Sequence, residues 1–320
     1  MKILIADTFP GSHVTALKNR GHQITFDPDL EADALDNAIG ENEILIVRGT
    51  AVRASTLENG KALRLVVRAG AGTNSIDKVH AAKANVRVCN VPGANATAVA
   101  ELVMGLIIAI DRNIESNACD LKAGIWNKKK YSRARGLHGQ NIGILGLGAV
   151  GLAVAERARA FGMKIYAVHK PDRLLETERR IRAVGITQVR SLEELLPVCD
   201  IVSLHMPLAQ ETKRMVNESF LDKMKAGAIF INTSRGDLVD ETALIQAMDS
   251  KDIRAGLDVY NDEPGTGIRT FESKLARHKR VCGTHHIGAS TEQAQNAVAD
   301  GVMEIIQSYE NGDLKYCVNN

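Results

Sequence analysis

The hydrophobic positions of the chain fall into short runs of apolar, often β-branched residues, which are typical of buried strands. Helical patterns of roughly 10–15 residues separate most of these runs. Strands that alternate with helices predict parallel sheets covered on both faces, and therefore an α/β fold. The predicted strands are Lys2–Asp7, Gln23–Phe26, Ile44–Val47, Leu65–Val67, Val86–Cys89, Asn141–Leu145, Lys164–Val168, Asp200–Leu204, Ala228–Ile231, Arg254–Val259 and Arg280–Gly283.

A break near residue 98 divides these strands into two series. The pattern predicts a long helix over Asn95–Asp111, followed by a polar stretch over Asn127–Arg135, and the second series then begins at Asn141. A last helix is predicted over Thr291–Tyr309. Because a chain of 320 residues favours about two domains, we interpret the break as a domain boundary.

Composition narrows the class of protein. Hydrophobic residues make up 45 % of the chain and charged residues 24 %, as in a soluble globular protein. The start of the chain has no long apolar segment typical of a secretory signal, and the longest apolar run, 98–110, contains Glu101 and is too short for a membrane span. The 5 cysteines are far apart and form no C-x-x-C pair. We therefore expect a cytoplasmic protein in a reducing compartment, without a disulfide framework, a metal site or a membrane partner.

The net charge of +2 gives no reason to expect a nucleic-acid partner. One local cluster of basic residues could bind anions or nucleic acid, but no aromatic platform or groove-reading motif accompanies it. We interpret it as a solvated loop before a strand. The cluster consists of Lys128, Lys129, Lys130, Arg133 and Arg135.

A glycine pattern of the form G-x-G-x-x-G, at Gly146, Gly148 and Gly151, follows the first strand of the second series and opens a helix with Ala149 and Val150. In that context Gly146 permits a tight turn, Gly148 lets backbone N–H groups approach a pyrophosphate, and Gly151 lets the helix pack closely on the strand. The helix N-terminus offers unpaired donors to the anion. The pattern predicts a dinucleotide site at Gly146, Gly148, Ala149, Val150 and Gly151.

The end of the next strand bears on the choice between NAD and NADP. An Asp or Glu that would hold the adenosine ribose is expected about 20 residues on, but His169 and Lys170 stand there, with Arg173 shortly after. These residues could hold a 2′-phosphate by charge-assisted hydrogen bonds, which would favour NADP. Alternatively, His169 bonds the ribose or Asp172 substitutes for the acid, and NAD works. The sequence leaves both cofactors open.

Three later segments each carry a side chain suited to the reduction of a 2-oxo acid, and each follows a predicted strand. Arg235 fits a carboxylate bidentately. His286 fits proton transfer, because histidine side chains titrate near neutral pH. Glu263 would stabilise the imidazolium. Spacing alone does not show that the three converge.

These segments, in this order after the glycine pattern, resemble the D-isomer-specific 2-hydroxyacid dehydrogenase family over essentially the whole chain. They are Asn232–Gly236, Leu257–Pro264 and His286–Thr291. The resemblance implies a catalytic set of Arg235, Glu263 and His286, where His286 rather than His285 precedes Ile287-Gly288. The family usually has Pro where His285 stands. It also implies that Pro207, Thr233 and Asp258 line the cofactor site.

The family implies two doubly wound parallel-sheet domains: a Rossmann NAD(P)-binding domain of residues 99–287, inserted in a flavodoxin-like substrate domain of residues 1–98 and 288–320. Within the family, the segments Arg68–Gly72, Gly93–Glu101 and His286–Gln295 are most similar to the 3-phosphoglycerate dehydrogenases. Gly49 stands where that subfamily often has Ser, and Thr50 where some members have a second Arg. The implied substrate residues are Arg48, Gly70, Ala71, Gly72, Asn95 and Gln295.

The resemblance implies interconversion of 3-phosphoglycerate and 3-phosphohydroxypyruvate, in serine biosynthesis, with a homodimer built on the long helix and the arm through Trp126. A glyoxylate or hydroxypyruvate reductase and an NAD(H)-sensing, corepressor-like binding protein are the alternatives. A formate dehydrogenase is disfavoured, since such relatives carry Gln where Glu263 stands. Long members add a regulatory domain that binds serine; with 34 residues after His286, we expect no such feedback here.

Overall fold

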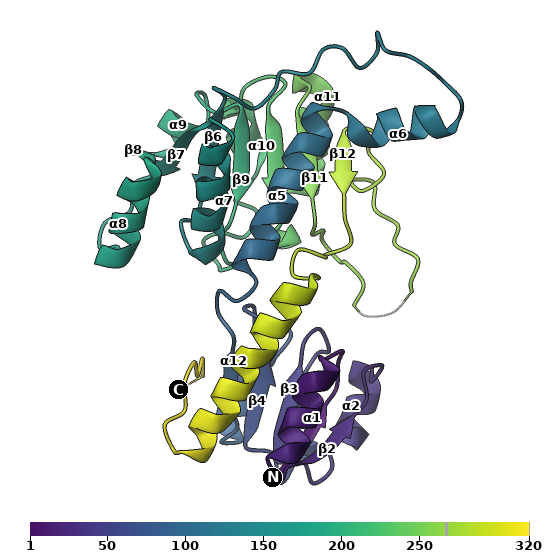
Figure 1. Ribbon diagram of the computed structural model, residues 1–320, viewed down its shortest axis with the longest axis vertical. Helices are drawn as coiled ribbons and strands as arrows, with labels where there is room; N and C mark the ends of the chain where they lie inside the picture. The colour runs from purple at the N-terminus through teal and green to yellow at the C-terminus, as the bar shows by residue number, and fades with distance from the viewer. Residues whose placement is uncertain (266–267, 320) are drawn as a thin grey trace. The chain divides into compact units, whose positions relative to one another are not determined.

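The computed structural model describes residues 1–265 and 268–319, which form two compact units (Figure 1). The described residues of Met1–Asn95, Pro264–Thr270 and Ala289–Asn320 form the first unit. Those of Ala96–Glu263 and Phe271–Gly288 form the second. This division differs from the sequence-based boundaries in three places. Residues 96–98 belong to the second unit because they begin a continuous helix of that unit, and Gly288 belongs to it as well. The described residues of Pro264–Thr270 join the first unit.

The first unit is built around a five-stranded parallel sheet with the order β2-β1-β3-β4-β5. That order is the flavodoxin-like doubly wound order, as predicted. Its elements are β1 (Lys2–Ile5), α1 (Gly11–Asn19), β2 (Gln23–Phe26), α2 (Ala32–Ala38), β3 (Ile44–Val47), α3 (Ala54–Asn59), β4 (Leu65–Arg68), α4 (Lys78–Lys83), β5 (Arg87–Asn90) and α12 (Glu292–Glu310).

Alternate residues of these strands fill two separate cores, because successive side chains of a strand point to opposite faces of the sheet. On one face, Ile3, Ile46 and Val67 pack with α1 and α12. On the other, Leu45 and Val66 pack with helices that include α2 and α3. Burial on both faces explains why these strands are nearly continuous apolar runs in the sequence.

The second unit is built around a seven-stranded parallel sheet with the order β12-β11-β10-β9-β6-β7-β8. The order reverses between β6 and β9, as in the Rossmann fold, so the predicted fold class is confirmed. Its elements are α5 (Ala96–Asp111), α6 (Ile114–Lys122), β6 (Asn141–Leu145), α7 (Ala149–Ala160), β7 (Lys164–Val168), α8 (Leu175–Val184), β8 (Thr187–Val189), α9 (Leu192–Leu195), β9 (Ile201–Leu204), α10 (Glu218–Lys223), β10 (Ile229–Asn232), the 3-10 helix η1 (Gly236–Leu238), α11 (Glu241–Lys251), β11 (Arg254–Leu257) and β12 (Val281–Gly283).

Helices α5 and α7 lie next to each other on one face of this sheet (Figure 1). They share a core with Ile144 and Ile231, whereas α10 and α11 share the opposite core with Val202 and Phe230. The carboxyl ends of β6, β9, β10 and β11 thus meet at one edge between the two helical layers, where ligands bind in such sheets.

The last residues of the chain pair with the edge strand β5. Val318 N–H donates to the Val88 carbonyl at 2.8 Å, and Cys89 and Cys317 are partners in an isolated antiparallel bridge. The side chain of Asn319 accepts from Val88 N–H at 2.7 Å and donates to the Val86 carbonyl at 2.8 Å. This tail therefore covers an edge that would otherwise expose unpaired backbone groups.

Over residues 1–265 and 268–319, no helix is long and apolar enough to cross a bilayer. In the same ranges, no group of three or more His, Cys, Asp or Glu side chains is placed to hold a metal ion.

Candidate active site

The glycine pattern forms the turn between β6 and α7. Gly146 has a φ of +101°, and a Cβ there would lie 2.3 Å from the His205 carbonyl oxygen. A Cβ on Gly151 would lie 1.9 Å from the Gly146 carbonyl oxygen, so this glycine lets the helix pack on the turn. At Gly148, by contrast, a Cβ would meet nothing within 4 Å. The first and third glycines are needed by the fold itself, while the second leaves open space beside the backbone.

This turn fits a dinucleotide pyrophosphate. Gly148 is the N-cap residue of α7, and no side chain caps the helix there. The backbone N–H groups of the first turn, which begins with Ala149 and Val150, are the donors that a helix leaves unpaired at its N-terminus and that bind anions. Directly after β10, the buried hydroxyl of Thr233 has no hydrogen-bond partner within the described residues. An orphaned hydroxyl and an uncapped helix are both suited to a bound ligand.

At the end of β7, the side chains of His169 and Lys170 are exposed. His169 Nδ1 lies 3.1 Å from Gln188 Oε1 on β8. Arg173 donates to the same Gln188 oxygen at 2.7 Å and to the Val168 carbonyl at 2.9 Å. Arg173 thus ties its loop to β7 and β8, and His169 and Lys170 are left as the more accessible basic groups.

Arg235 lies on a turn after β10 that its neighbours hold in place. The buried Asn232 side chain donates to the Arg235 carbonyl at 2.8 Å and accepts from Ser234 N–H at 3.0 Å. The hydroxyl of Ser234 donates to the Leu204 carbonyl at 2.8 Å, which links the turn to β9. Gly236 completes the turn: a Cβ there would lie 2.1 Å from the Tyr260 carbonyl carbon.

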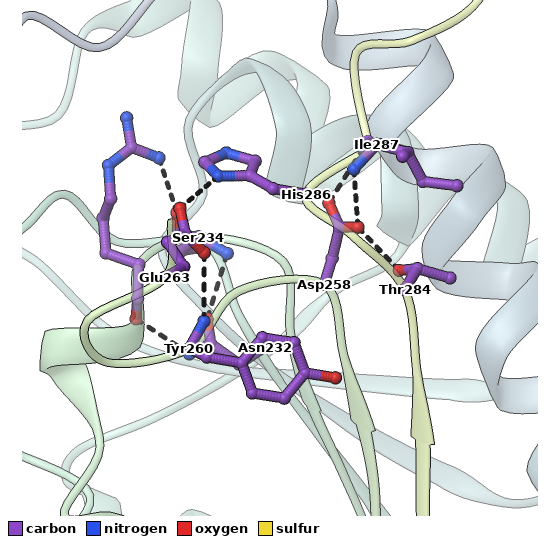
Figure 2. A network of polar contacts seen from close by, with 10 residues as sticks. Asn232, Ser234, Asp258, Tyr260, Glu263, Thr284, His286 and Ile287 are labelled. Atoms are coloured by element: carbon purple, nitrogen blue, oxygen red, sulfur yellow. Dashed lines mark hydrogen bonds and ion pairs between the residues drawn. The ribbon is translucent and has the colours of Figure 1, made fainter. Parts of the chain in front are cut away.

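Glu263 and His286 form a direct pair, with Glu263 Oε1 2.5 Å from His286 Nδ1 (Figure 2). The other Glu263 oxygen accepts from Tyr260 N–H at 3.1 Å. Burial raises the pKa of Glu263, but the hydrogen bond and charge of His286, the Tyr260 N–H and the charge of Arg235 together hold it below its ordinary value. Glu263 is therefore a carboxylate at neutral pH, and Nε2 is the His286 nitrogen available to a substrate.

Arg235 interacts electrostatically with Glu263. Burial lowers the pKa of its guanidinium from the ordinary value, while the charge of Glu263 raises it. The group remains a cation at neutral pH, because arginine titrates far above that range. The structure thus brings a cation, a carboxylate and an imidazole to the carboxyl edge of one sheet.

Asp258 holds the loop that carries His286. Its carboxylate is buried and accepts from Thr284 Oγ1 at 2.6 Å and from the backbone N–H groups of Ile287 and Gly288, each at 2.8 Å (Figure 2). The Asp258 carbonyl also accepts from His286 N–H at 2.8 Å. These bonds fix His286 at a φ of +52°, in the left-handed region that few side chains adopt.

Of the substrate residues implied by the resemblance, Arg48 follows β3 in the first unit. The buried carboxylate of Asp7 accepts from the backbone N–H groups of Arg48, Gly49 and Thr50, at 2.6, 3.0 and 3.0 Å. The Arg48 guanidinium donates to Ser290 Oγ at 3.4 Å. A carboxylate that accepts three backbone donors fixes the loop and leaves most of the guanidinium donors for a ligand.

The other implied substrate residues lie in three places in the first unit. Gly70, with a φ of +142°, and Ala71 follow β4, and the carbonyl of Ala71 accepts from Asn90 Nδ2 on β5 at 2.5 Å. Gly72 continues this loop, and Asn95 directly precedes α5. Gln295, on the first turn of α12, lines a pocket of about 340 Å³ with residues that include Thr8, Ser12 and Glu292.

Pro207 follows β9, two residues after His205, whose carbonyl oxygen lies beside the glycine turn. His205 accordingly belongs to the switch point of the sheet, although the glycine and proline patterns alone do not mark it. Burial lowers the pKa of His205 to about 3. The ring is neutral at working pH and pairs through Nε2 with Ser203 Oγ at 2.8 Å.

A sequence profile described as D-isomer specific 2-hydroxyacid dehydrogenase, NAD binding domain, matches residues 104–288, more than half of the chain. The chain belongs to this family. The resemblance predicted from its motifs is confirmed, and so is an NAD-binding domain, in a family of oxidoreductases.

Individual relatives of the dehydrogenase differ in their substrates. The chain described here is 41 % identical over 281 residues to a hydroxypyruvate reductase of Thermotoga maritima. This match covers 87 % of the present chain and 88 % of that protein. The chain is 35 % identical to the D-3-phosphoglycerate dehydrogenase of Methanocaldococcus jannaschii, over 100 % of this chain but 59 % of that one. Its structure is similar to NAD⁺-bound 3-phosphoglycerate dehydrogenase of Entamoeba histolytica, with a TM-score of 0.81, 28 % identity and coverage of 100 % and 99 %.

Several residues that hold the predicted site residues of each unit in place carry no motif of their own. Asp7 follows β1 in the first unit, and its carboxylate acts on a loop that begins 41 residues later. Asn232 and Ser234 lie within the Arg235 segment, but their hydrogen bonds to the turn do not follow from their spacing. Gln188 lies on β8, a strand that the sequence analysis missed. The contacts of Asp7, Gln188 and the Ser234 hydroxyl are hydrogen bonds between residues distant in the sequence, whereas those of Asn232 lie within its own turn.

Proposed function

We propose that this dehydrogenase interconverts a D-2-hydroxy acid and the corresponding 2-oxo acid, with His286 as the proton acceptor and donor. The observation that carries the proposal is the Glu263–His286 pair, which turns one ring nitrogen of an exposed imidazole toward solvent and anchors the other. A histidine held in this way suits general acid–base catalysis.

In the oxidation direction, His286, Glu263 and Arg235 each have a defined role. His286 Nε2 takes the proton of the 2-hydroxyl, while Glu263 stabilises the imidazolium that forms. Arg235 binds the substrate carboxylate and polarises the oxygen on C2. The nicotinamide, when bound, supplies the hydride acceptor. The buried Asp258 keeps the His286 loop in position throughout.

The substrate that we propose first is 3-phosphoglycerate, with 3-phosphohydroxypyruvate as the product, in serine biosynthesis in the cytoplasm. Arg48 supports this assignment, because its backbone is fixed by Asp7 and its guanidinium keeps donors for a phosphate. The relatives named D-3-phosphoglycerate dehydrogenase match this chain over nearly its whole length.

Hydroxypyruvate is the second candidate substrate. The relative at 41 % identity is named a hydroxypyruvate reductase, and this chain covers 88 % of it, compared with about half to three fifths of the phosphoglycerate dehydrogenases. In the loop after β3, Arg48 is followed by Gly49 and Thr50, so no second guanidinium stands directly beside it.

Initial rates for a small panel of acids decide between these substrates. The panel contains 3-phosphohydroxypyruvate, hydroxypyruvate and glyoxylate, each with NADH and with NADPH. We expect the highest kcat/KM for the phosphorylated acid. Arg48→Gln should lower that kcat/KM at least about tenfold, which is equivalent to the loss of one charged hydrogen bond. The same variant should change the turnover of hydroxypyruvate little. A preference for hydroxypyruvate that Arg48→Gln does not alter would favour the reductase. If the protein binds the dinucleotide but turns over none of these acids, the NAD(H)-sensing binding protein becomes the favoured function.

The cofactor preference can be tested at the end of β7. Since no carboxylate stands there and His169 and Lys170 are exposed, we expect NADPH to be accepted, with His169→Asp shifting kcat/KM toward NADH at least about tenfold. Lys164→Gln, at the opposite end of the same strand, is the control. A wild-type enzyme that uses only NADH would contradict this expectation.

A further inference from the structure

Two cysteines far apart in the sequence face each other across a backbone bridge in the first unit. Cys89 lies on β5, and Cys317 lies in the tail that pairs with it. Asn90 N–H donates to the Tyr316 carbonyl at 3.3 Å, and Val318 N–H donates to the Val88 carbonyl at 2.8 Å. Because these bonds flank the two cysteines without joining them, Cys89 and Cys317 are a non-hydrogen-bonded antiparallel pair.

This kind of pair places side chains closest to each other. The Cα atoms of a non-hydrogen-bonded pair are about 4.5 Å apart, which lies inside the range of about 4.4–6.8 Å that disulfides span. The two thiols already interact: contact with Cys317 is one of the influences on the Cys89 thiol. All five cysteines are free thiols in this structure, and the other three belong to the second unit.

The register of the pair is fixed by bonds on either side of it. Asn319 bridges two backbone groups of the Val86–Val88 segment, and Lys315 N–H donates to Ser308 Oγ on α12 at 3.1 Å. A slip of one residue would break these bonds and turn Cys317 to the opposite face. The thiols therefore meet because the tail is anchored, and forming a bond between them needs little backbone movement.

We propose that Cys89 and Cys317 form a reversible disulfide that locks the tail onto β5 when the protein meets a peroxide. The two sulfurs differ in access: Cys89 is buried and Cys317 is half-buried. Burial, and then the neighbouring Cys317, raises the pKa of the Cys89 thiol to about 12, so this thiol stays protonated. Cys317 is thus the sulfur that reacts with the oxidant first. Cys89 then reacts with the oxidised Cys317 to form the disulfide.

The chemistry balances with hydrogen peroxide as the oxidant. The Cys317 thiolate attacks one peroxide oxygen, the O–O bond breaks, and hydroxide leaves, which gives a sulfenic acid. The Cys89 sulfur then attacks the Cys317 sulfur, the S–OH bond breaks, and water leaves with the Cys89 proton. In total two thiols lose two electrons and one peroxide gives two waters. A dithiol such as dithiothreitol reverses the bond by exchange.

The bond would act on a strand that supports a predicted substrate loop. Asn90, next to Cys89, donates to the Ala71 carbonyl, and Val91 N–H donates to the Gly70 carbonyl at 3.0 Å. The pairing of the cysteines does not depend on which acid the enzyme uses. Its test can therefore succeed or fail independently of the proposed function.

The experiment uses the full chain, oxidised with one or a few equivalents of hydrogen peroxide, alkylated, and digested with trypsin without reduction. Cleavage after Arg87, Arg112 and Lys315 places Cys89 in the peptide Val88–Arg112 and Cys317 in the peptide that begins at Tyr316. We expect mass spectrometry to find these two peptides joined, with two fewer free thiols per chain, and dithiothreitol to separate them.

Variants identify the partners. Cys317→Ser, at a half-buried position that leaves the buried Cys89 intact, should abolish the joined peptides. Cys119→Ser, which removes an exposed thiol of α6 in the other unit, should leave them unchanged. Joined peptides in the Cys317→Ser protein, separate oxidation of the two sulfurs to sulfinic acids, or linkage only through Cys119 between chains would each overturn the proposal.

Discussion

His286 presents one ring nitrogen to a substrate, because Nδ1 lies 2.5 Å from Glu263 Oε1. If Nε2 transfers the proton, His286→Asn should lower kcat about 10²–10⁴-fold, the usual contribution of general acid–base catalysis. Asn tolerates the left-handed backbone that His286 adopts, so the loop should keep its shape. Steady-state kinetics with the best acid of the panel measure the effect, and dinucleotide binding should stay within about twofold.

Matched changes at the neighbours separate proton transfer from substrate binding. Arg235→Ala should impair substrate use while it leaves dinucleotide affinity nearly intact, because its proposed partner is the substrate carboxylate. His285→Asn, at the exposed neighbour of His286, should turn over at close to the wild-type rate. Wild-type turnover in His286→Asn, or a large loss in His285→Asn, would contradict the assignment.

His205 gives the stability of the protein a pH dependence. Its folded pKa of about 3 lies below the ordinary value of 6.5, so below pH 6.5 the unfolded chain binds a proton that the folded chain excludes. The free energy of unfolding should therefore be fully retained above pH 6.5 and should fall as the pH drops toward 3, with this group contributing about 1.4 kcal/mol per pH unit.

The substitution His205→Gln tests this contribution. Its amide can replace the ring nitrogen that pairs with Ser203 Oγ, but it does not titrate. Urea unfolding at pH 7, 6 and 5 should give a shallower decline for the variant than for the wild type. Equal slopes in the two proteins would show that folding does not lower the pKa of His205.

At the scale of elements, the turn from β6 to α7 separates a glycine needed for folding from one needed for binding. Gly151→Ala would put a Cβ 1.9 Å from the Gly146 carbonyl oxygen, so overpacking should destabilise the fold by about 1–3 kcal/mol. Gly148→Ala meets nothing within 4 Å and should fold normally, but its methyl group would occupy the space that the pyrophosphate needs.

Thermal unfolding and fluorescence titration with NADH and NADPH measure the two effects separately. Gly148→Ala should bind the cofactor at least about tenfold more weakly at an unchanged Tm. Gly11→Ala, in open space on α1 of the first unit, is the control for the substitution itself and should lower neither the cofactor affinity nor the Tm. Normal binding by Gly148→Ala would contradict the proposed position of the pyrophosphate.

The same scale shows why the sequence predicted some elements and missed others. The buried strands were predicted because each of them is a short apolar run, as in Ile44–Val47. β8 was missed because its three residues, Thr187–Val189, include two polar ones and lie at the edge of the sheet. α6 was missed because it has only 9 residues, most of which are polar, and none of them is buried.

The candidate site was also predicted only where its residues belong to local sequence patterns. Gly146, Gly151 and the Arg235 and His286 segments lie in local patterns whose chemistry could be predicted, because turn geometry and motif order are local. The roles of Asp7 and Asp258 could not, since each carboxylate acts on a loop about 30–40 residues away that only folding brings near. Likewise, the spacing of Cys89 and Cys317 gave no sign that the two thiols would meet.

At the scale of the whole molecule, the arm after α5 exposes apolar side chains that a monomer would leave in water. Ile114, Leu121 and Ile125 are each about half exposed, and Trp126 is 82 % exposed. α6 buries none of its residues against its own unit. Since exposed apolar groups of this size favour association, we expect a homodimer in which this arm is covered.

Light scattering coupled to size-exclusion chromatography at micromolar concentration should therefore give about twice the chain mass of 34.6 kDa. A double variant, Leu121→Glu with Trp126→Glu, should shift the protein toward a monomer, because it would place carboxylates in the apolar interface. Val79→Glu, at an apolar side chain that is 65 % exposed on α4 of the other unit, should leave the mass unchanged. A wild-type mass of one chain would reject the dimer, and a dimer that survives the double variant would mean that another surface holds the two copies together.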